Sequence, residues 1–279
     1  MNVRPQKPEF ISVIASIYNS PEWLEKSLWG FAFQEHRDFE LLIADDGSDD
    51  VTAELLDRMR EQTGLTLKHV WQDNDGQRKC TVLNKAVDQA AGDYLLFTEG
   101  SCLPRSDFVM QHHRAAQRGR FLSGGNYRLP NALSEQITED DIRSGNAFSA
   151  TWLCQRGLPK SHRLIRLTAQ GWQAKILNRI TTTRPTWNGS NSSGWADDIG
   201  NANGFDERMY DGLEDRELGD RLENAGVRGK HIRYQSVSLQ LSPQCEQSVK
   251  TNTTDSMQIR IETKRLQRTQ TPHGIQRAA

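Results

Sequence analysis

Residues Leu95 to Pro104 read LLFTEGSCLP and give the clearest indication of the fold. An apolar run that ends in an acidic turn predicts a buried strand with Glu99 at its carboxyl end. Open α/β sheets bind their ligands at the carboxyl ends of the parallel strands. We therefore expect Glu99 to lie at a ligand site, provided that the rest of the chain forms such a sheet.

Strand and helix patterns alternate through the first half of the chain, which is typical of a parallel sheet with crossover helices. Ser20 is expected to cap a helix that begins at Pro21, and Gly92 to end another helix as its C-cap. A further helix is expected to start at Pro104. The expected strands are Phe10–Ile17, Phe39–Ala44, Leu65–Trp71 and Tyr94–Thr98, and the other expected helices are Val51–Gln62 and Lys79–Ala91.

The second half carries weaker patterns. We expect strands at Phe121–Tyr127 and Lys230–Leu239 with an irregular region from Leu129 to about Arg166 between them. From Gln244 onward the chain is polar with a weak helical stripe, so a surface helix and partial disorder both stay open. The helices expected here are Ile176–Ile180, Asp198–Ala202 and Leu213–Ala225.

Composition narrows the class of protein. The 279 residues suit one large domain, and a net charge of -1 from 35 basic and 36 acidic residues gives no overall field for nucleic acid or an anionic membrane. Local patches stay possible. The four cysteines, spaced widely at Cys80, Cys102, Cys154 and Cys245, predict neither a zinc site nor a disulfide framework and favour a reducing cytoplasm.

The apolar run from Phe10 to Tyr18 is too short to span a bilayer and leads into a turn without a cleavage pattern. It predicts a buried first strand. We therefore expect a cytoplasmic protein whose contact with a membrane, if any, is peripheral to the inner membrane.

Two acidic clusters are candidates for chemistry. Asp45 and Asp46 follow the second strand, where a carboxylate can accept hydrogen bonds from a base or ribose, although a helix cap explains them equally well. Glu214 and Asp215 lie at the start of a helix whose dipole keeps a carboxylate ionised, as a general base requires. Ordinary acidity at a helix start is the alternative for this pair.

Taken in order, the motifs resemble those of the bacterial family 2 inverting glycosyltransferases, with a galactosyltransferase-like carboxyl-terminal segment. The resemblance extends from about Phe10 to Pro243 and implies a GT-A (Rossmann-like) α/β fold, a mostly parallel central sheet flanked by helices in a single domain. It implies a nucleotide-binding half at about 10–126, an acceptor-side half at about 127–243 and a polar tail at 244–279. The motifs are ASIYN at residue 15, LIADDGS at 42, GQRK at 76, LNKA at 83, NGFDE at 203 and ED at 214.

The resemblance assigns roles by position. Asp215 is implied as the catalytic base, with Glu214 beside it positioning a sugar. The residues implied to bind the nucleotide are Tyr18, Asn19, Asp45, Asp46, Arg78 and Glu99.

Three departures from the family pattern concern the metal. Glu99 and Ser101 stand where the family carries aspartates, and Gln240 stands near the position of a metal-binding histidine. One carboxylate with a hydroxyl and an amide is a poor ligand set for manganese or magnesium, so a divalent cation is expected to bind weakly or not at all. The segment from Trp187 to Gly194 is also more polar than the family pattern, so the sequence does not decide whether it forms the acceptor-side wall of the site.

These features predict an inverting transferase that moves a hexose from a UDP-sugar to a cell-surface glycan of the lipopolysaccharide or capsule type, with activity reduced by the altered metal ligands. The alternative is a non-catalytic nucleotide-sugar-binding protein, or an engineered one, that retains the fold. The expected partners are a nucleotide-sugar donor and a glycan acceptor, with no nucleic acid.

Overall fold

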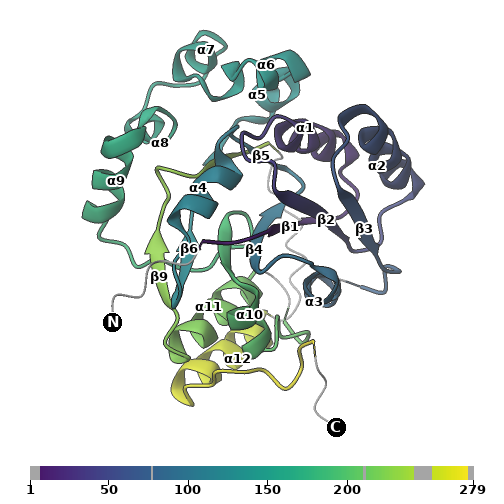
Figure 1. Cartoon of the computed structure of the whole chain (residues 1–279), viewed down its shortest axis with the longest axis vertical. Helices are drawn as coiled ribbons and strands as arrows, with labels where there is room; N and C mark the ends of the chain where they lie inside the picture. The colour runs from purple at the N-terminus through teal and green to yellow at the C-terminus, as the bar shows by residue number, and fades with distance from the viewer. Residues whose placement is uncertain (1–6, 77, 210–211, 242–252, 276–279) are drawn as a thin grey trace.

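The central element is a sheet of seven strands in the order β3-β2-β1-β4-β8-β6-β9, seen in a computed structural model that describes residues 7–76, 78–209, 212–241 and 253–275 (Figure 1). Strands β1 to β4 run parallel, and β8 is inserted antiparallel between β4 and β6. The strands are β1 Ile11–Ile17, β2 Phe39–Asp45, β3 Leu67–Trp71, β4 Tyr94–Glu99, β6 Arg120–Ser123, β8 Ser192–Trp195 and β9 Arg228–His231.

Helices cover both faces of this sheet, which explains why its central strands are predominantly apolar. Alternate residues of β1 face opposite layers: Val13 packs with α1, α2 and α4, whereas Ile14 packs with α3, α10 and α11 (Figure 1). The protein is therefore a single α/β domain with a core on each side of the sheet. These helices are α1 Pro21–Ala32, α2 Asp50–Thr63, α3 Lys79–Gln89, α4 Phe108–Ala115, α10 Ala196–Asn201 and α11 Glu214–Asn224.

A second sheet of three strands, in the order β5-β10-β7, lies beside the end of β4. Its register places Gln240 opposite Cys102, so the late strand β10 reaches the turn that follows Glu99. Short helices from the middle of the chain pack over this sheet with their own apolar cluster. The remaining elements are β5 Cys102–Pro104, β7 Gly125–Arg128, β10 Val237–Gln240, α5 Asn131–Gln136, α6 Glu139–Arg143, η1 Asn146–Phe148, α7 Ala150–Gln155, η2 His162–Leu164, α8 Ile165–Thr168 and α9 Gly171–Ile180.

Two expected strands are wrong as single elements. The stretch 121–127 divides into β6 and β7, and the stretch 230–239 divides into β9 and β10. In each case the two pieces belong to different sheets, because the chain crosses from the large sheet to the small one at Gly124 and at residues 232–236. The pattern of hydrophobic residues does not indicate where a chain passes from one sheet to another.

Three local expectations are also wrong. Pro104 ends β5, and the next helix begins four residues later at Phe108. Ser20 occupies the N-cap position of α1 but accepts no capping hydrogen bond; its hydroxyl donates to the carbonyl of Tyr18. Gly92 is not a C-cap: a Cβ there would lie 2.5 Å from the backbone nitrogen of Ser12, so this glycine allows a close approach to β1.

The tail contains the helix α12 Thr253–Arg265, which packs on α11, where the hydroxyl of Thr263 donates to Glu217 at 2.8 Å. Beyond it, the backbone nitrogen of Ile275 donates to the carbonyl of Asn203, so this segment contacts the loop before α11. Cys245 lies outside the described residues. In the described part of the chain, no helix combines the length and the apolar character that crossing a bilayer requires.

Candidate functional site

The carboxyl edge of the central sheet gathers the first set of predicted residues. Pairing of β1 with β2 sets Ile17 opposite Asp45, and pairing of β1 with β4 sets Ser16 opposite Glu99. Tyr18 and Asn19 follow directly and connect this edge to α1. Residues widely separated in sequence therefore meet at one rim because parallel strands end together.

Asp45 is buried within this rim and hydrogen-bonds to groups of the protein itself. It has no exposed surface, and its two carboxylate oxygens take the backbone N–H of Ser48 at 2.8 Å and the Nε2 of His69 at 2.9 Å. Burial alone would raise the pKa of Asp45, but these two partners hold the pKa below its ordinary value. The structure thus places Asp45 as a group that fixes the turn after β2.

Asp46 faces the next loop. Its carboxylate accepts from Gln72 Nε2 at 2.6 Å and from the backbone N–H of Arg78 at 2.9 Å. Burial raises the pKa of Asp46 despite both hydrogen bonds. Asp46 thereby ties the end of β2 to the start of α3, whereas the Arg78 side chain turns away to the carbonyl of Asp73.

These contacts predict different outcomes for the two aspartates. Asp46→Ala should weaken UDP binding by about 1–3 kcal/mol, since it removes an acceptor at the rim. Asp45→Ala should lower the free energy of unfolding by a similar amount, because the N–H of Ser48 and His69 would lose a buried partner. Calorimetric UDP titrations and thermal unfolding of both variants measure the two effects. If Asp45→Ala mainly weakened UDP binding and Asp46→Ala mainly lowered the free energy of unfolding, these roles would be wrong.

Two exposed aromatic rings flank the rim. Trp71 ends β3 opposite Asp45 with 47% of its surface exposed, and its Nε1 donates to the carbonyl of Ser48 at 3.2 Å. Tyr18 is 51% exposed. The sequence reasoning missed Trp71, although an aromatic residue at the carboxyl end of a strand was the available signal. Exposed rings of this kind offer flat faces on which a base can stack.

The start of α11 forms the other wall of the site. Glu214 and Asp215 are its first two residues and are almost completely buried, at 2% and 8% exposure. The ammonium group of Lys79, the first residue of α3, lies 3.2 Å from Glu214 Oε1. Two helix starts therefore meet at the rim and bring an acid pair against a cation.

Asp215 has the electrostatics of a base. Burial raises its pKa to about 7; Lys79 opposes this shift, while the charges of Glu214 and Glu99 add to it. Among the described residues, no donor reaches Asp215 Oδ1, which is buried. A Cβ on Gly189 would lie 2.6 Å from Asp215 Oδ2, so only glycine fits against this carboxylate. Asp215 can thus take a proton near neutral pH through an oxygen that the chain leaves unused.

Lys79 joins the two halves of the site as a cation at the start of α3, where the sequence places it beside Arg78. Burial would lower its pKa, but Glu214, Asp215 and Glu99 outweigh burial and raise the pKa above its ordinary value. Lys79 is therefore a permanent cation beside three carboxylates. Only folding brings residues from α3, β4 and α11 together, so no spacing along the chain indicated this cluster.

The three positions predicted for a metal do converge. The side-chain nitrogen of Gln240 donates to Glu99 Oε2 at 3.3 Å and to Ser101 Oγ at 3.2 Å. Its oxygen faces the other way and accepts from Asn126 at 3.4 Å. One carboxylate with a hydroxyl and an amide is a poor set of ligands for a resident divalent cation. Within the described residues, no group of three or more His, Cys, Asp or Glu side chains is placed to hold a metal ion.

The polar segment before β8 is explained by the sheet. His112 is fully buried and contacts Ser193 Oγ at 2.7 Å and Asn191 Oδ1 at 2.9 Å. Burial lowers the pKa of His112 to about 4, so the ring is neutral. Asn191 also donates to the carbonyl of Gly125 at 2.9 Å. The polar residues at 191–193 are therefore a hydrogen-bonded interior network.

The fold defines the class of structure: an α/β domain of the GT-A type. Residues 12–140 match the family model described as Glycosyl transferase family 2, so this part of the chain is similar to that family. An uncharacterized glycosyltransferase of Bacillus subtilis, YfnE, is 34% identical over 105 residues, which are 37% of this chain and 26% of that protein. The chain spans 27%, 23%, 23% and 26% of the length of the first curated relatives that it matches.

Solved structures confirm the fold over nearly the whole chain. The mannosyltransferase PcManGT from Pyrobaculum calidifontis, solved in complex with GDP-Man and Mn2+, superposes with a TM-score of 0.58 at 18% identity, covering 95% of this chain and 65% of that one. Residues 1–349 of Staphylococcus aureus TarS in complex with UDP-GlcNAc give 0.55 at 16% identity, covering 90% and 64%. The expected GT-A architecture is therefore correct.

Proposed function

We propose that this protein is an inverting glycosyltransferase that moves a hexose from a UDP-sugar to a hydroxyl of a cell-surface glycan, with Asp215 as the general base. The observation that carries the proposal is the Asp215 carboxylate, which is buried, has a pKa raised to about 7 and has one oxygen without a partner in the described chain. A base of this kind removes the acceptor proton as the hydroxyl attacks the anomeric carbon. Inversion then needs no covalent intermediate.

Donor recognition is proposed for the opposite side of the rim. The rings of Tyr18 and Trp71 would flank the base, and Asp46 would accept from the ribose or the base. The ammonium of Lys79 would face the diphosphate and stabilise its charge as the bond to the sugar breaks. The structural neighbours solved with UDP-GlcNAc and GDP-Man support a nucleotide-sugar donor in general.

Donor binding and acceptor binding are assigned to successive parts of the chain. We propose residues 10–126 as the nucleotide-binding half and residues 127–243 as the acceptor-side half, with Glu214 positioning a sugar beside Asp215. Divalent metal is assigned no step, because Glu99, Ser101 and Gln240 offer only one carboxylate and are hydrogen-bonded to one another. In this proposal Lys79 supplies the positive charge that a bound metal ion would otherwise provide at the diphosphate.

A nucleotide-sugar-binding protein without transferase activity is the second candidate. It is favoured by the hydrogen bonds that tie Glu99 and Ser101 to Gln240, because these side chains are then engaged with one another. Calorimetric titration with a panel of nucleotides and UDP-sugars, with and without manganese, followed by measurement of sugar-nucleotide consumption, separates the two. Consumption of one UDP-hexose supports transfer, and tight binding without consumption across the panel supports the alternative.

The pKa of Asp215 predicts the pH dependence of turnover. Because the raised pKa is about 7, kcat should fall about tenfold per unit below that pH, where the base is protonated, and level off above it. Glu214→Gln should move this limb to lower pH, since Glu214 contributes to raising the pKa of Asp215. Rate profiles of both proteins over the neutral range are the measurement, and a limb that the substitution leaves in place would argue against Asp215 as the titrating group.

A further inference from the structure

The helix α9 exposes an apolar stripe to solvent. Trp172, Ile176 and Ile180 are 69%, 49% and 65% exposed and recur every four residues. The buried residues of the same helix are Ala174 and Asn178. At about 100° per residue, the stripe points almost directly away from that buried face. Three large apolar side chains on one outward face are unfavourable in water unless something covers them.

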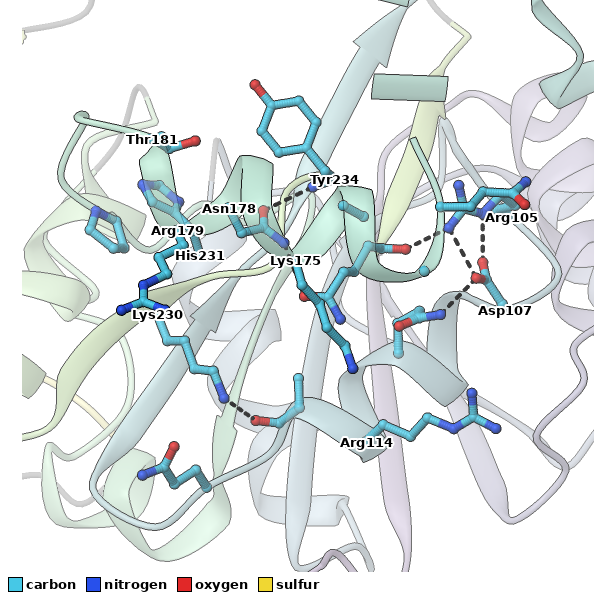
Figure 2. A pocket seen from close by; sticks show the side chains of 18 of the residues that line it. Arg105, Asp107, Arg114, Lys175, Asn178, Arg179, Thr181, Lys230, His231 and Tyr234 are labelled. Atoms are coloured by element: carbon cyan, nitrogen blue, oxygen red, sulfur yellow. Dashed lines mark hydrogen bonds and ion pairs between the residues drawn. The ribbon is translucent and has the colours of Figure 1, made fainter. Parts of the chain in front are cut away.

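Cations lie along one flank of this stripe. Lys175 and Arg179 line an open groove of about 1110 Å3 between α9, α4 and β9. Arg114, Arg120 and Lys230 also line the groove. In Figure 2, Lys175 reaches down from α9 into the opening between Lys230 and Arg114.

The groove has few internal counter-charges. Its carboxylates are Glu35 and Asp107, and Asp107 is already paired with Arg105 at 2.6 Å. Within the described part of the chain, no carboxylate pairs with Arg114, Arg120, Lys175 or Arg179. Burial lowers the pKa of Lys230, and the charges of Lys7 and Arg120 lower it further. The chain as a whole carries a net charge of -1, so this excess of cations is local and suits an anionic partner.

An outward apolar stripe beside a row of cations is the pattern of a helix that lies in the interface of an anionic bilayer. We propose that α9 and the adjoining groove form a docking surface for a membrane rich in anionic phospholipid, with the stripe entering the interface and the groove facing lipid phosphates. A soluble anion would account for the groove but would leave Trp172, Ile176 and Ile180 uncovered. The proposal does not depend on the transferase reaction.

The surface is firmly linked to the candidate site. Asn178 of α9 donates to Gln235 at 2.9 Å and accepts from the backbone N–H of Tyr234 at 3.1 Å. That loop leads directly into β10, whose last residue Gln240 contacts Glu99. Docking through α9 would therefore fix the orientation of the sheet rim relative to the bilayer.

Vesicle co-sedimentation of the full chain tests the surface. Vesicles of phosphatidylcholine with phosphatidylglycerol should bind the protein in a salt-sensitive way, and pure phosphatidylcholine should bind it far less. Trp172→Gln with Ile176→Gln, and separately Lys175→Gln with Arg179→Gln, should each weaken binding about tenfold or more. All four positions are exposed, and unchanged thermal unfolding verifies that each variant is folded.

The matched control is a pair of apolar residues at the same spacing elsewhere. Met257 and Ile261 on α12 are 45% and 50% exposed, and Met257→Gln with Ile261→Gln should leave binding unchanged. Full binding by either α9 variant, equal loss in the α12 control, or equal binding to neutral vesicles would overturn the proposal. Displacement from vesicles by pyrophosphate at constant ionic strength would also overturn it and assign the groove to a soluble anion.

Discussion

Asp215→Asn should lower kcat about 10²-fold or more while UDP affinity stays nearly constant. The asparagine keeps the size of the side chain but cannot take the acceptor proton, and proton removal acts in the transition state only. A loss of this size corresponds to about 2.7 kcal/mol of transition-state stabilisation. Steady-state turnover of the UDP-hexose identified in the panel, with calorimetry of UDP binding, gives both quantities.

The matched control is Asp197→Asn. Asp197 also lies in the first turn of a helix, α10, but it is paired with Arg118 at the surface. Its substitution should leave turnover within about twofold, since surface changes away from a site have small effects. If Asp215→Asn weakened UDP binding as strongly as turnover, the Asp215 carboxylate would be a structural group and the proposed base would be wrong.

Lys79→Met should reduce turnover about 10²-fold and weaken UDP binding, while uridine binding stays unchanged. Removing one preorganised positive partner of a developing negative charge typically has an effect of this size. The methionine keeps the apolar stem of the side chain and deletes the charge that faces Glu214, Asp215 and Glu99. Parallel titrations with UDP and uridine separate diphosphate recognition from base recognition.

The same substitution has a second readout that a structural role would not share. Because Lys79 lowers the pKa of Asp215, its loss should move the acid limb of the rate profile to higher pH, opposite to the shift for Glu214→Gln. Lys79→Arg should restore part of the turnover. Lys85→Met, on the exposed side of α3, is the control and should behave as the unmodified protein. Equal losses of UDP and uridine affinity would mean that Lys79 has a structural role and does not contact the diphosphate.

The positions of the first strands and of the carboxylates at their ends followed from sequence. The strands β1, β2 and β4 are buried on both faces, so their sequences are predominantly apolar and easy to locate. Parallel strands end at one edge, so the sequence places Asp46 and Glu99 at one rim. Local patterning was sufficient because each of these elements is defined by its own residues.

The assembly of the second half was decided only by tertiary structure. The strand β8 is inserted antiparallel between β4 and β6 and consists of Ser192, Ser193, Gly194 and Trp195, a polar run with no alternation. It is stable in the interior because His112 and Tyr94 hydrogen-bond to Ser193. Such partners lie about a hundred residues away along the chain, so no local pattern signals them.

The chemistry divides in the same way. The sequence is enough to name the carboxylates that begin α11 and the side chains at the positions expected to hold a metal, because those are statements about residue type and position. Folding alone decided that Lys79 lies among Glu99, Glu214 and Asp215 and that the pKa of Asp215 is raised to about 7. Charge interactions depend on distance and burial, and both are set by the packing of α3, β4 and α11 against one another.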